Sequence, residues 1–162
     1  MIRNRRDEDF DRLCDILGEL DDHAGVIAER RPRGWLQEVD ADRSWVFDQA
    51  PVRVTPTGNV VGHVQIYQSS DASWVCHVAT QLSRRADDLL VIGRLFVRPG
   101  KHDYGIARYL LTESVKYVEK QGCLPVLDPL DLLFLPASLC AKLGFKELPT
   151  EDGLRSAIAR TQ

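Results

Sequence analysis

The chain contains few cysteines, and they are widely separated: Cys14, Cys76, Cys123 and Cys140. Their spacing shows none of the close pairs that bind metal ions, so we expect reduced thiols and no metal site. The sequence also has no apolar run of membrane-spanning length, and its charged N-terminus lacks a signal-peptide core. These absences predict a cytoplasmic protein that does not span a membrane.

An excess of positive charge is also missing. The 162 residues include 21 Lys and Arg against 24 Asp and Glu, which gives a formal net charge of −3. A protein that binds nucleic acid broadly usually carries a basic surface, so we expect no nucleic-acid partner. Hydrophobic residues make up 44% and charged residues 28% of the chain, as in ordinary globular domains. The length is sufficient to bury a core, and we expect one domain over residues 1–162.

The hydrophobic pattern predicts a mixed α/β protein. Apolar and β-branched runs predict strands at residues 2–5, 44–54, 60–67, 89–97, 124–127 and 154–159. Apolar residues at three- and four-residue steps predict helices at 7–20, around 32–34, from 106 to a Gly122 cap, and at 138–143. A hairpin turn is expected at 57–59, and residues 74–79 suit either a strand or an irregular loop.

The most informative segment joins the predicted strand 89–97 to the helix that starts near Ile106. Pro99 and Gly100 mark a turn between the two. A strand that enters a helix through such a loop directs several backbone N–H groups at one point, where the helix dipole adds positive charge. Three cations lie in or beside the loop: Arg98, Lys101 and Arg108. The segment is therefore suited to bind a phosphate or pyrophosphate group.

Other interpretations of this loop remain. Short glycine-containing connections without a ligand are common between strands and helices. A nucleoside-triphosphate loop is disfavoured, because Gly100-Lys101 has no glycine at the required upstream spacing and no Ser or Thr after the lysine. A dinucleotide fingerprint is disfavoured as well, since the glycines do not follow the Gly-x-Gly-x-x-Gly spacing.

Two ordered motifs resemble the GNAT superfamily of acyl-CoA-dependent N-acetyltransferases. Val97-Arg98-Pro99 and Gly105-Ile106-Ala107 match the start and the end of the family's acyl-CoA loop, while His102 stands where the family usually has Arg or Gln. Downstream, Ala141-Lys142-Leu143-Gly144-Phe145-Lys146 is similar to the turn that follows the family's last helix. Together the motifs cover roughly residues 89–148.

The resemblance implies a GNAT-like α/β (α+β) fold, with a mixed, mostly antiparallel central sheet flanked by helices and a splayed strand pair at the cofactor site. It implies acetyl-CoA as cosubstrate and no metal. Backbone groups of Leu95, Phe96 and Val97 would pair with the pantetheine arm. The pyrophosphate would be held by backbone N–H groups of the loop residues His102, Asp103, Tyr104, Gly105, Ile106 and Ala107. The acetyl group would pass to an amine by direct attack.

Catalytic residues are harder to assign. Cys140 stands where the family commonly has a Tyr that protonates the CoA thiolate, and it is either that acid or a small buried residue. Leu133 replaces a common Asn that binds the pantetheine arm. Asp128 is either a base facing the acceptor channel or a turn residue before Pro129.

Two histidines, His63 and His77, are candidates for a base that titrates near neutral pH, although such residues are more often surface or core histidines. The three tryptophans are either core residues or walls of an acceptor pocket: Trp35, Trp45 and Trp74.

The function implied by the resemblance is transfer of an acetyl group from acetyl-CoA to a primary amine on a small molecule or peptide. No nucleic acid or membrane partner is expected, and the oligomeric state, a homodimer included, is left open. Because the family's usual Tyr and Asn are replaced, an alternative is a catalytically weak acyl-CoA-binding or sensing module of the same fold. A structural α/β domain without a cofactor is a third interpretation.

Overall fold

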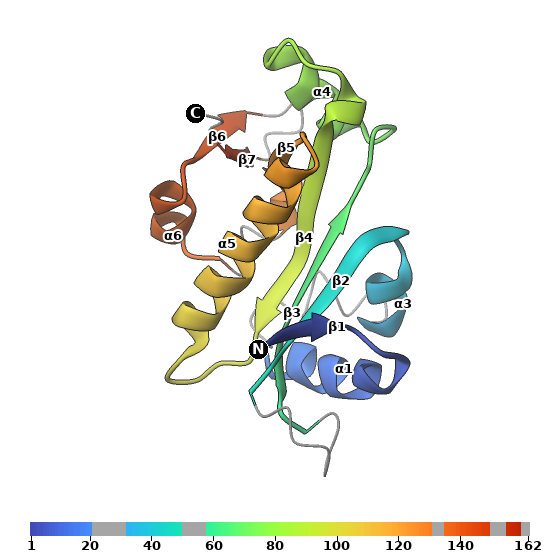
Figure 1. Cartoon of the computed structure of the whole chain (residues 1–162), viewed down its shortest axis with the longest axis vertical. Coiled ribbons are helices and arrows are strands. Elements are labelled where there is room, and N and C mark those ends of the chain that lie inside the picture. Colours follow the sequence, from blue (N-terminus) through green and yellow to red (C-terminus); the bar gives the residue numbers. More distant parts are fainter. Residues whose placement is uncertain (21–31, 50–57, 131–134, 150–154, 160–162) are drawn as a thin grey trace.

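A computed structural model describes residues 1–20, 32–49, 58–130, 135–149 and 155–159. These residues form one mixed sheet with strand order β1-β2-β3-β4-β5-β7-β6 (Figure 1). The strands are β1 (Ile2–Asn4), β2 (Ala41–Asp48), β3 (Val60–Tyr67), β4 (Leu89–Val97), β5 (Leu124–Leu127), β6 (Phe145–Pro149) and β7 (Arg155–Ala159). Only β4 and β5 pair in parallel, as expected for two strands joined by a crossover helix.

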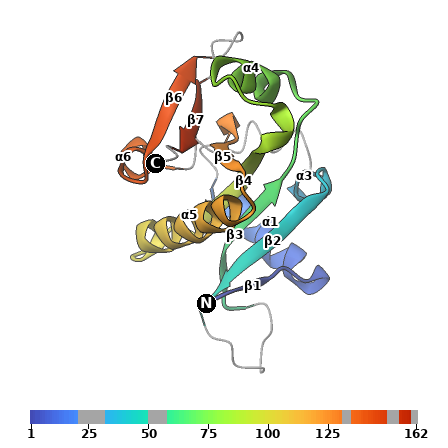
Figure 2. The same ribbon diagram turned by 45° about the horizontal axis from the view of Figure 1, so that its top comes forward.

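Helices cover both faces of the sheet. They are α1 (Phe10–Glu19), α3 (Pro32–Gln37), α4 (Ser73–Gln81), α5 (Asp103–Lys120) and α6 (Ala137–Lys142), with short 3-10 helices at Asp7–Asp9 and Ala86–Asp88. Figure 2 shows α5 on one side of the sheet and α1 and α3 on the other. Side chains alternate along β4, so that each face of the strand contacts a different helix. Leu90 and Ile92 pack with α5, whereas Leu89 and Val91 pack with α4.

Most of the predicted elements are present. The strands predicted at 89–97 and 124–127 have those bounds, and the helix that follows the loop is α5. Gly122 has φ +76° after α5, in agreement with the predicted glycine cap. The helix predicted at 7–20 is the 3-10 turn plus α1, and the one predicted near 32–34 is α3. Gly144 has φ +87° at the turn from α6 into β6.

Two predictions need correction. Residues 74–79 belong to helix α4, not to a strand or loop, because Val75, Val78 and Ala79 form a helical face buried against Leu89 and Val91. Strand β6 was not expected; it pairs with β7 at the edge of the sheet. Some positions named in the predictions lie outside the described residues: 26–31, 50–57, Leu133 and Leu154. The predicted hairpin turn at 57–59 and the predicted elements that extend into these ranges are therefore described only in part.

The β4–β5 pair creates the feature that positions the site. Pairing runs from Leu89↔Leu124 to Ile92↔Leu127, and the backbone N–H of Asp128 adds a last hydrogen bond to the Ile92 carbonyl at 3.1 Å. Beyond this point β4 continues to Val97 without a partner on β5. The two strands therefore separate at Ile92 and Asp128, and the fork opens toward the loop before α5.

Candidate functional site at the β4–β5 fork

A cavity of about 260 Å³ lies beside the part of β4 that β5 does not pair with. Its walls come from the end of β4, the start of α5, the end of α1 and the segment before α6; they include Leu95, Phe96, Val97, Leu20, Ala107, Leu135 and Pro136. The lining is mostly apolar, and Leu95 and Phe96 are almost fully buried. The cavity thus combines an apolar wall with a strand edge that β5 does not cover, which suits an extended, partly apolar ligand.

The N-terminus of α5 stands at this cavity, with Asp103 and Tyr104 in its lining. Several of its N–H groups already have acceptors: that of Tyr104 donates to Asp103 Oδ1 at 2.7 Å, and that of Ile106 donates to the His102 carbonyl at 3.0 Å. The N–H of Gly105 has no acceptor within the described part of the chain. A Cβ on Gly105 would meet no atom within 4 Å, so a side chain could be added at this position without a clash.

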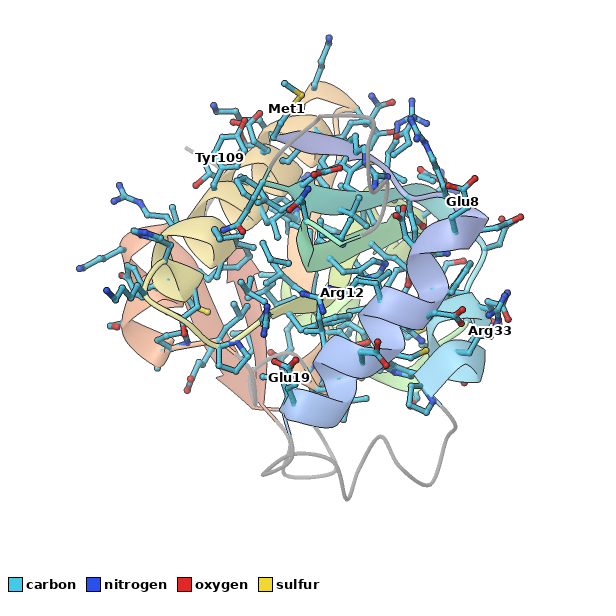
Figure 3. All side chains as sticks on the ribbon, turned by 90° about the horizontal axis from the view of Figure 1, so that it is seen from below. Met1, Glu8, Arg12, Glu19, Arg33 and Tyr109 are labelled. Carbon is cyan, nitrogen blue, oxygen red and sulfur yellow. The ribbon has the colours of Figure 1, made fainter. Side chains whose placement is uncertain are left out.

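Cations surround the helix start unevenly. Lys101 and His102 are exposed beside the N-terminus of α5, and Arg108 is exposed one turn further along the helix. Arg98 instead donates to Glu19 at 3.0 Å, which ties the end of β4 to the last turn of α1. Glu19 is labelled at that end of α1 in Figure 3. An anion at the helix start would therefore meet Lys101 and His102 before the already paired Arg98.

Asp128 lies at the fork, 15% exposed, and both of its carboxylate oxygens accept hydrogen bonds. Oδ1 accepts from the backbone N–H of Leu130 at 3.0 Å, and Oδ2 accepts from the Tyr67 hydroxyl at 2.6 Å. The first bond is the turn role expected from sequence. The second, together with the Arg94 guanidinium 3.8 Å from Oδ2, fixes the orientation of this side chain at the point where the strands separate.

Arg94 organises the side chains on the α3 face of the fork. It donates through Nη1 to the Tyr67 hydroxyl at 2.9 Å, through Nη2 to Glu38 at 3.1 Å and through Nε to the Trp35 carbonyl at 3.2 Å. Its guanidinium carbon lies 5.3 Å from the Trp35 ring centre and 5.1 Å from that of Tyr67. Cation–π contacts and three hydrogen bonds compensate a charge whose side chain is only 6% exposed.

The other candidates are dispersed. Cys140 is buried in the core with Leu139 and Phe145, and it does not line the cavity. His77 lies on α4, where its ring contacts Gln81 at 2.7 Å, away from the fork. Trp45 packs edge-on against Tyr117, and Trp74 packs against the α4 cluster. Of the three tryptophans, only Trp35 contributes to the site.

The sequence interpretation did not identify Tyr67, Arg94 or Glu38 as site residues. One local signal was present: Arg94 is the only charged residue in the otherwise apolar run from Leu89 to Val97. A charge inside a buried strand requires a partner, and that partner was not deducible, because Glu38 and Tyr67 are distant in sequence. The cluster forms only when α3, β3 and β4 are packed together.

Metal ligands and membrane-spanning helices are both absent from the described residues. No three His, Cys, Asp or Glu side chains come together as a metal site in the described part of the chain. Within the same residues, no helix has both the length and the apolarity needed to cross a membrane.

Solved structures with this architecture include several acetyltransferases. A GNAT family acetyltransferase from Brucella melitensis in complex with acetyl-CoA matches with a TM-score of 0.59 and 18% identity over 100% of this chain and 88% of its own. The paia N-acetyltransferase from Thermoplasma acidophilum in complex with coenzyme A matches with a TM-score of 0.63 and 16% identity, covering 99% and 98% of the two chains. An aminoglycoside 6'-N-acetyltransferase from Enterococcus faecium matches with a TM-score of 0.57 and 15% identity, covering 98% and 93%.

The fold is therefore that of the GNAT acetyltransferases, as the sequence motifs predicted. The model of the acetyltransferase (GNAT) family matches residues 10–145, and the chain belongs to this family. No curated protein sequence gives a significant match.

Proposed function

We propose that this protein is an acetyl-CoA-dependent N-acetyltransferase that works as a single domain on a primary amine of a small molecule or peptide. The observation that carries the proposal is the fork between β4 and β5. It has an apolar cavity and a helix N-terminus on one side, and the Asp128 side chain held by a tyrosine and an arginine on the other. A thioester in the fork would lie between these two halves.

The donor half offers three kinds of contact. The strand edge formed by Leu95, Phe96 and Val97 would pair with the amides of a pantetheine arm. The N–H of Gly105, which has no acceptor among the described residues, and the dipole of α5 would bind the pyrophosphate. Lys101 and His102 add positive charge at the same end of the helix. These residues suit coenzyme A, because an apolar cavity lies beside the start of α5, whose Asp103 and Tyr104 help to line it.

In the acceptor half, we assign to Asp128 the role of receiving a proton. An amine is mostly an ammonium ion at neutral pH, and it must lose a proton before its nitrogen can attack a carbonyl carbon. The Tyr67 hydroxyl and the Arg94 guanidinium hold Asp128 Oδ2 in place, so the carboxylate would orient the ammonium and take its proton. The enzyme would otherwise supply mainly proximity and orientation.

The leaving thiolate requires little assistance. Cys140, at the position of the family's usual tyrosine, is only 5% exposed and packs among Leu139 and Phe145. A thiol is acidic enough that its anion is a tolerable leaving group near neutral pH. We therefore assign Cys140 to packing and expect the thiolate to take its proton from solvent.

The test is thioester turnover with a panel of primary amines. Turnover is measured as the release of the free CoA thiol. The wild-type protein should acetylate at least one amine, and Asp128→Asn should lower kcat/KM for that amine by about a hundredfold, the lower range for general base catalysis. The affinity for acetyl-CoA should remain unchanged in this variant. Asp87→Asn, an exposed carboxylate before β4, is the matched control and should behave as wild type.

The alternative, a catalytically weak acyl-CoA-binding module, is favoured by one observation: the buried Cys140 has replaced the usual acid. The same assay separates the two functions. Tight binding of acetyl-CoA by calorimetry without transfer to any amine in a broad panel would support the binding module, whereas absence of CoA binding would exclude both.

A further inference from the structure

His63 is a fully buried histidine on β3 whose two ring nitrogens are both engaged. Nδ1 lies 2.8 Å from the Arg94 carbonyl oxygen, and Nε2 lies 2.9 Å from Nη1 of Arg5. A carbonyl oxygen only accepts and a guanidinium only donates, so the ring must carry its proton on Nδ1 and accept at Nε2. His63 is therefore neutral. Burial first, and then the positive charge of Arg5, lower its pKa to about 3.

The carbonyl that His63 binds belongs to a β-bulge in β4. Gln65 pairs with Gly93 and His63 pairs with Phe96, so Arg94 and Leu95 together face the single residue Val64. Arg94 has φ +49°, a left-handed conformation that non-glycine residues rarely adopt. Such a conformation persists only where its surroundings fix it, and a buried bulge carbonyl requires a donor from outside the strand ladder. His63 provides that donor.

The bulge is shared by the two halves of the site. The side chain of Arg94 enters the acceptor half, where it contacts Glu38 and Tyr67. The next residues, Leu95 and Phe96, form the wall of the donor cavity. The Phe96 ring also stacks on the His63 ring, with centres 5.2 Å apart and planes inclined by 29°. One imidazole thus contacts the main chain of the bulge and the cavity wall that follows it.

We propose that His63 is a positioning residue of the acetyl-transfer site: its Nδ1–H holds the Arg94 carbonyl and so fixes how β4 presents Leu95 and Phe96 to the acyl donor and Arg94 to the acceptor half. This inference rests on the proposed function. Arg5 supports the role indirectly, because its guanidinium donates to Nε2 and so selects the tautomer that has a proton on Nδ1. His63 itself does not touch the reacting atoms.

Two substitutions separate positioning from packing. In His63→Asn, the shorter side chain can place an amide N–H where Nδ1–H was, whereas His63→Leu offers no donor. Both variants lose the imidazole stack on Phe96 and the contact with Arg5, so both should lose thermal stability, and the Leu variant should lose more because it leaves the Arg94 carbonyl without a donor. The Leu variant should also lower kcat/KM for acetyl-CoA by about tenfold or more, the cost of one unmet buried hydrogen bond, while the Asn variant stays within about threefold of wild type.

His77→Asn and His77→Leu, on α4, are the matched controls and should leave kinetics unchanged. Equal losses of kcat/KM in the two His63 variants, or wild-type kinetics in the Leu variant, would overturn the proposal. Absence of turnover by the wild type would instead contradict the proposed function. In that case the two His63 variants would be compared by their affinity for acetyl-CoA.

A second measurement needs no variant. Nitrogen NMR of labelled histidines in the wild-type protein should show His63 as a neutral ring with its proton on Nδ1 from about pH 8 down to about pH 5. Its signals should shift when CoA is added. A ring protonated on Nε2, a charged ring in this range, or signals indifferent to saturating CoA would contradict the role assigned to His63.

Discussion

Gly105 is the residue at which the proposed phosphate contact can be tested most directly. A Cβ at this position would meet no atom within 4 Å, so larger residues should fold there without a clash. We expect Gly105→Glu to keep the melting temperature of the wild type, since a carboxylate near a helix N-terminus is favourable. The same carboxylate would occupy the phosphate position and repel it.

Calorimetry with acetyl-CoA should therefore show at least a tenfold loss of affinity in Gly105→Glu, which corresponds to about 1.4 kcal/mol. Gly18→Glu is the matched control, because Gly18 is also an exposed helical glycine where an added Cβ would meet no atom within 4 Å. It adds the same charge on α1. Wild-type affinity in Gly105→Glu would show that the loop is only a connection.

Cys140 gives the opposite case, a residue at a catalytic position of the family that here belongs to the core. Cys140→Ala should lower the melting temperature slightly, because it removes one buried atom from the cluster around Leu139 and Phe145. Turnover should remain at the wild-type value. A fall in kcat with unchanged acetyl-CoA affinity would contradict this assignment and would show that the thiol protonates the leaving group.

At the scale of elements, the position of the loop depends on how closely α5 approaches the sheet. Gly62 on β3 makes this approach possible: a Cβ there would lie 3.0 Å from Leu110 Cδ1 and 3.4 Å from Ile106 Cγ2. Ile106 belongs to the first turn of α5, next to the proposed phosphate contact at Gly105. The packing of helix on strand therefore bears directly on the geometry of the anion site.

We expect Gly62→Val to push the first turns of α5 away from β3. The overpacking should reduce the free energy of unfolding by about 1–3 kcal/mol and weaken acetyl-CoA binding as the helix start moves. Gly62→Ala is a graded control, since the end of the Leu110 side chain can shift by a few tenths of an ångström. Denaturant unfolding and calorimetry on both variants are the measurements. If Gly62→Val is destabilised but binds CoA with wild-type affinity, CoA binding by the loop does not depend on the packing of α5 on β3.

Elements defined by local pattern were predictable, and those defined by distant partners were not. Strands β4 and β5 were predicted with their observed bounds because buried parallel strands are continuous apolar runs. Residues 74–79 were misread because a short apolar stretch fits either period, and only burial against Leu89 and Val91 distinguishes the helix. The strand, loop and helix from β4 into α5 follow from local sequence, whereas the contact of Asp128 with Tyr67 joins residues 61 positions apart.

At the scale of the whole molecule, ionic contacts connect the N-terminal segment to the sheet. Arg3 on β1 binds Asp9 at 2.8 Å and Asp48 on β2 at 2.9 Å. These carboxylates raise the pKa of Arg3 well above its ordinary value. Arg5, two residues on, reaches the Leu36 carbonyl and His63. The N-terminal strand thus contacts both α3 and the histidine beneath the bulge.

The neutral, buried His63 should make the stability of the whole fold sensitive to acid. Its pKa is about 3 in the folded protein, against an ordinary value of 6.5 when the chain unfolds. Below about pH 6.5 the unfolded chain binds a proton that the folded chain does not, so the free energy of unfolding falls as the pH decreases toward 3. The slope from this residue approaches about 1.4 kcal/mol per pH unit, and above pH 7 it vanishes.

Other groups also titrate in acid, so the comparison with His63→Asn isolates this contribution. The variant should be less stable than wild type at pH 8, and the difference should shrink by about 1.6 kcal/mol between pH 6.5 and pH 5, because asparagine has no proton to bind. Urea unfolding of both proteins across this range measures the difference directly. Two curves that stay parallel from pH 8 to pH 5 would mean that His63 takes up its proton without unfolding, and that the hydrogen bond to the Arg94 carbonyl does not require a neutral ring.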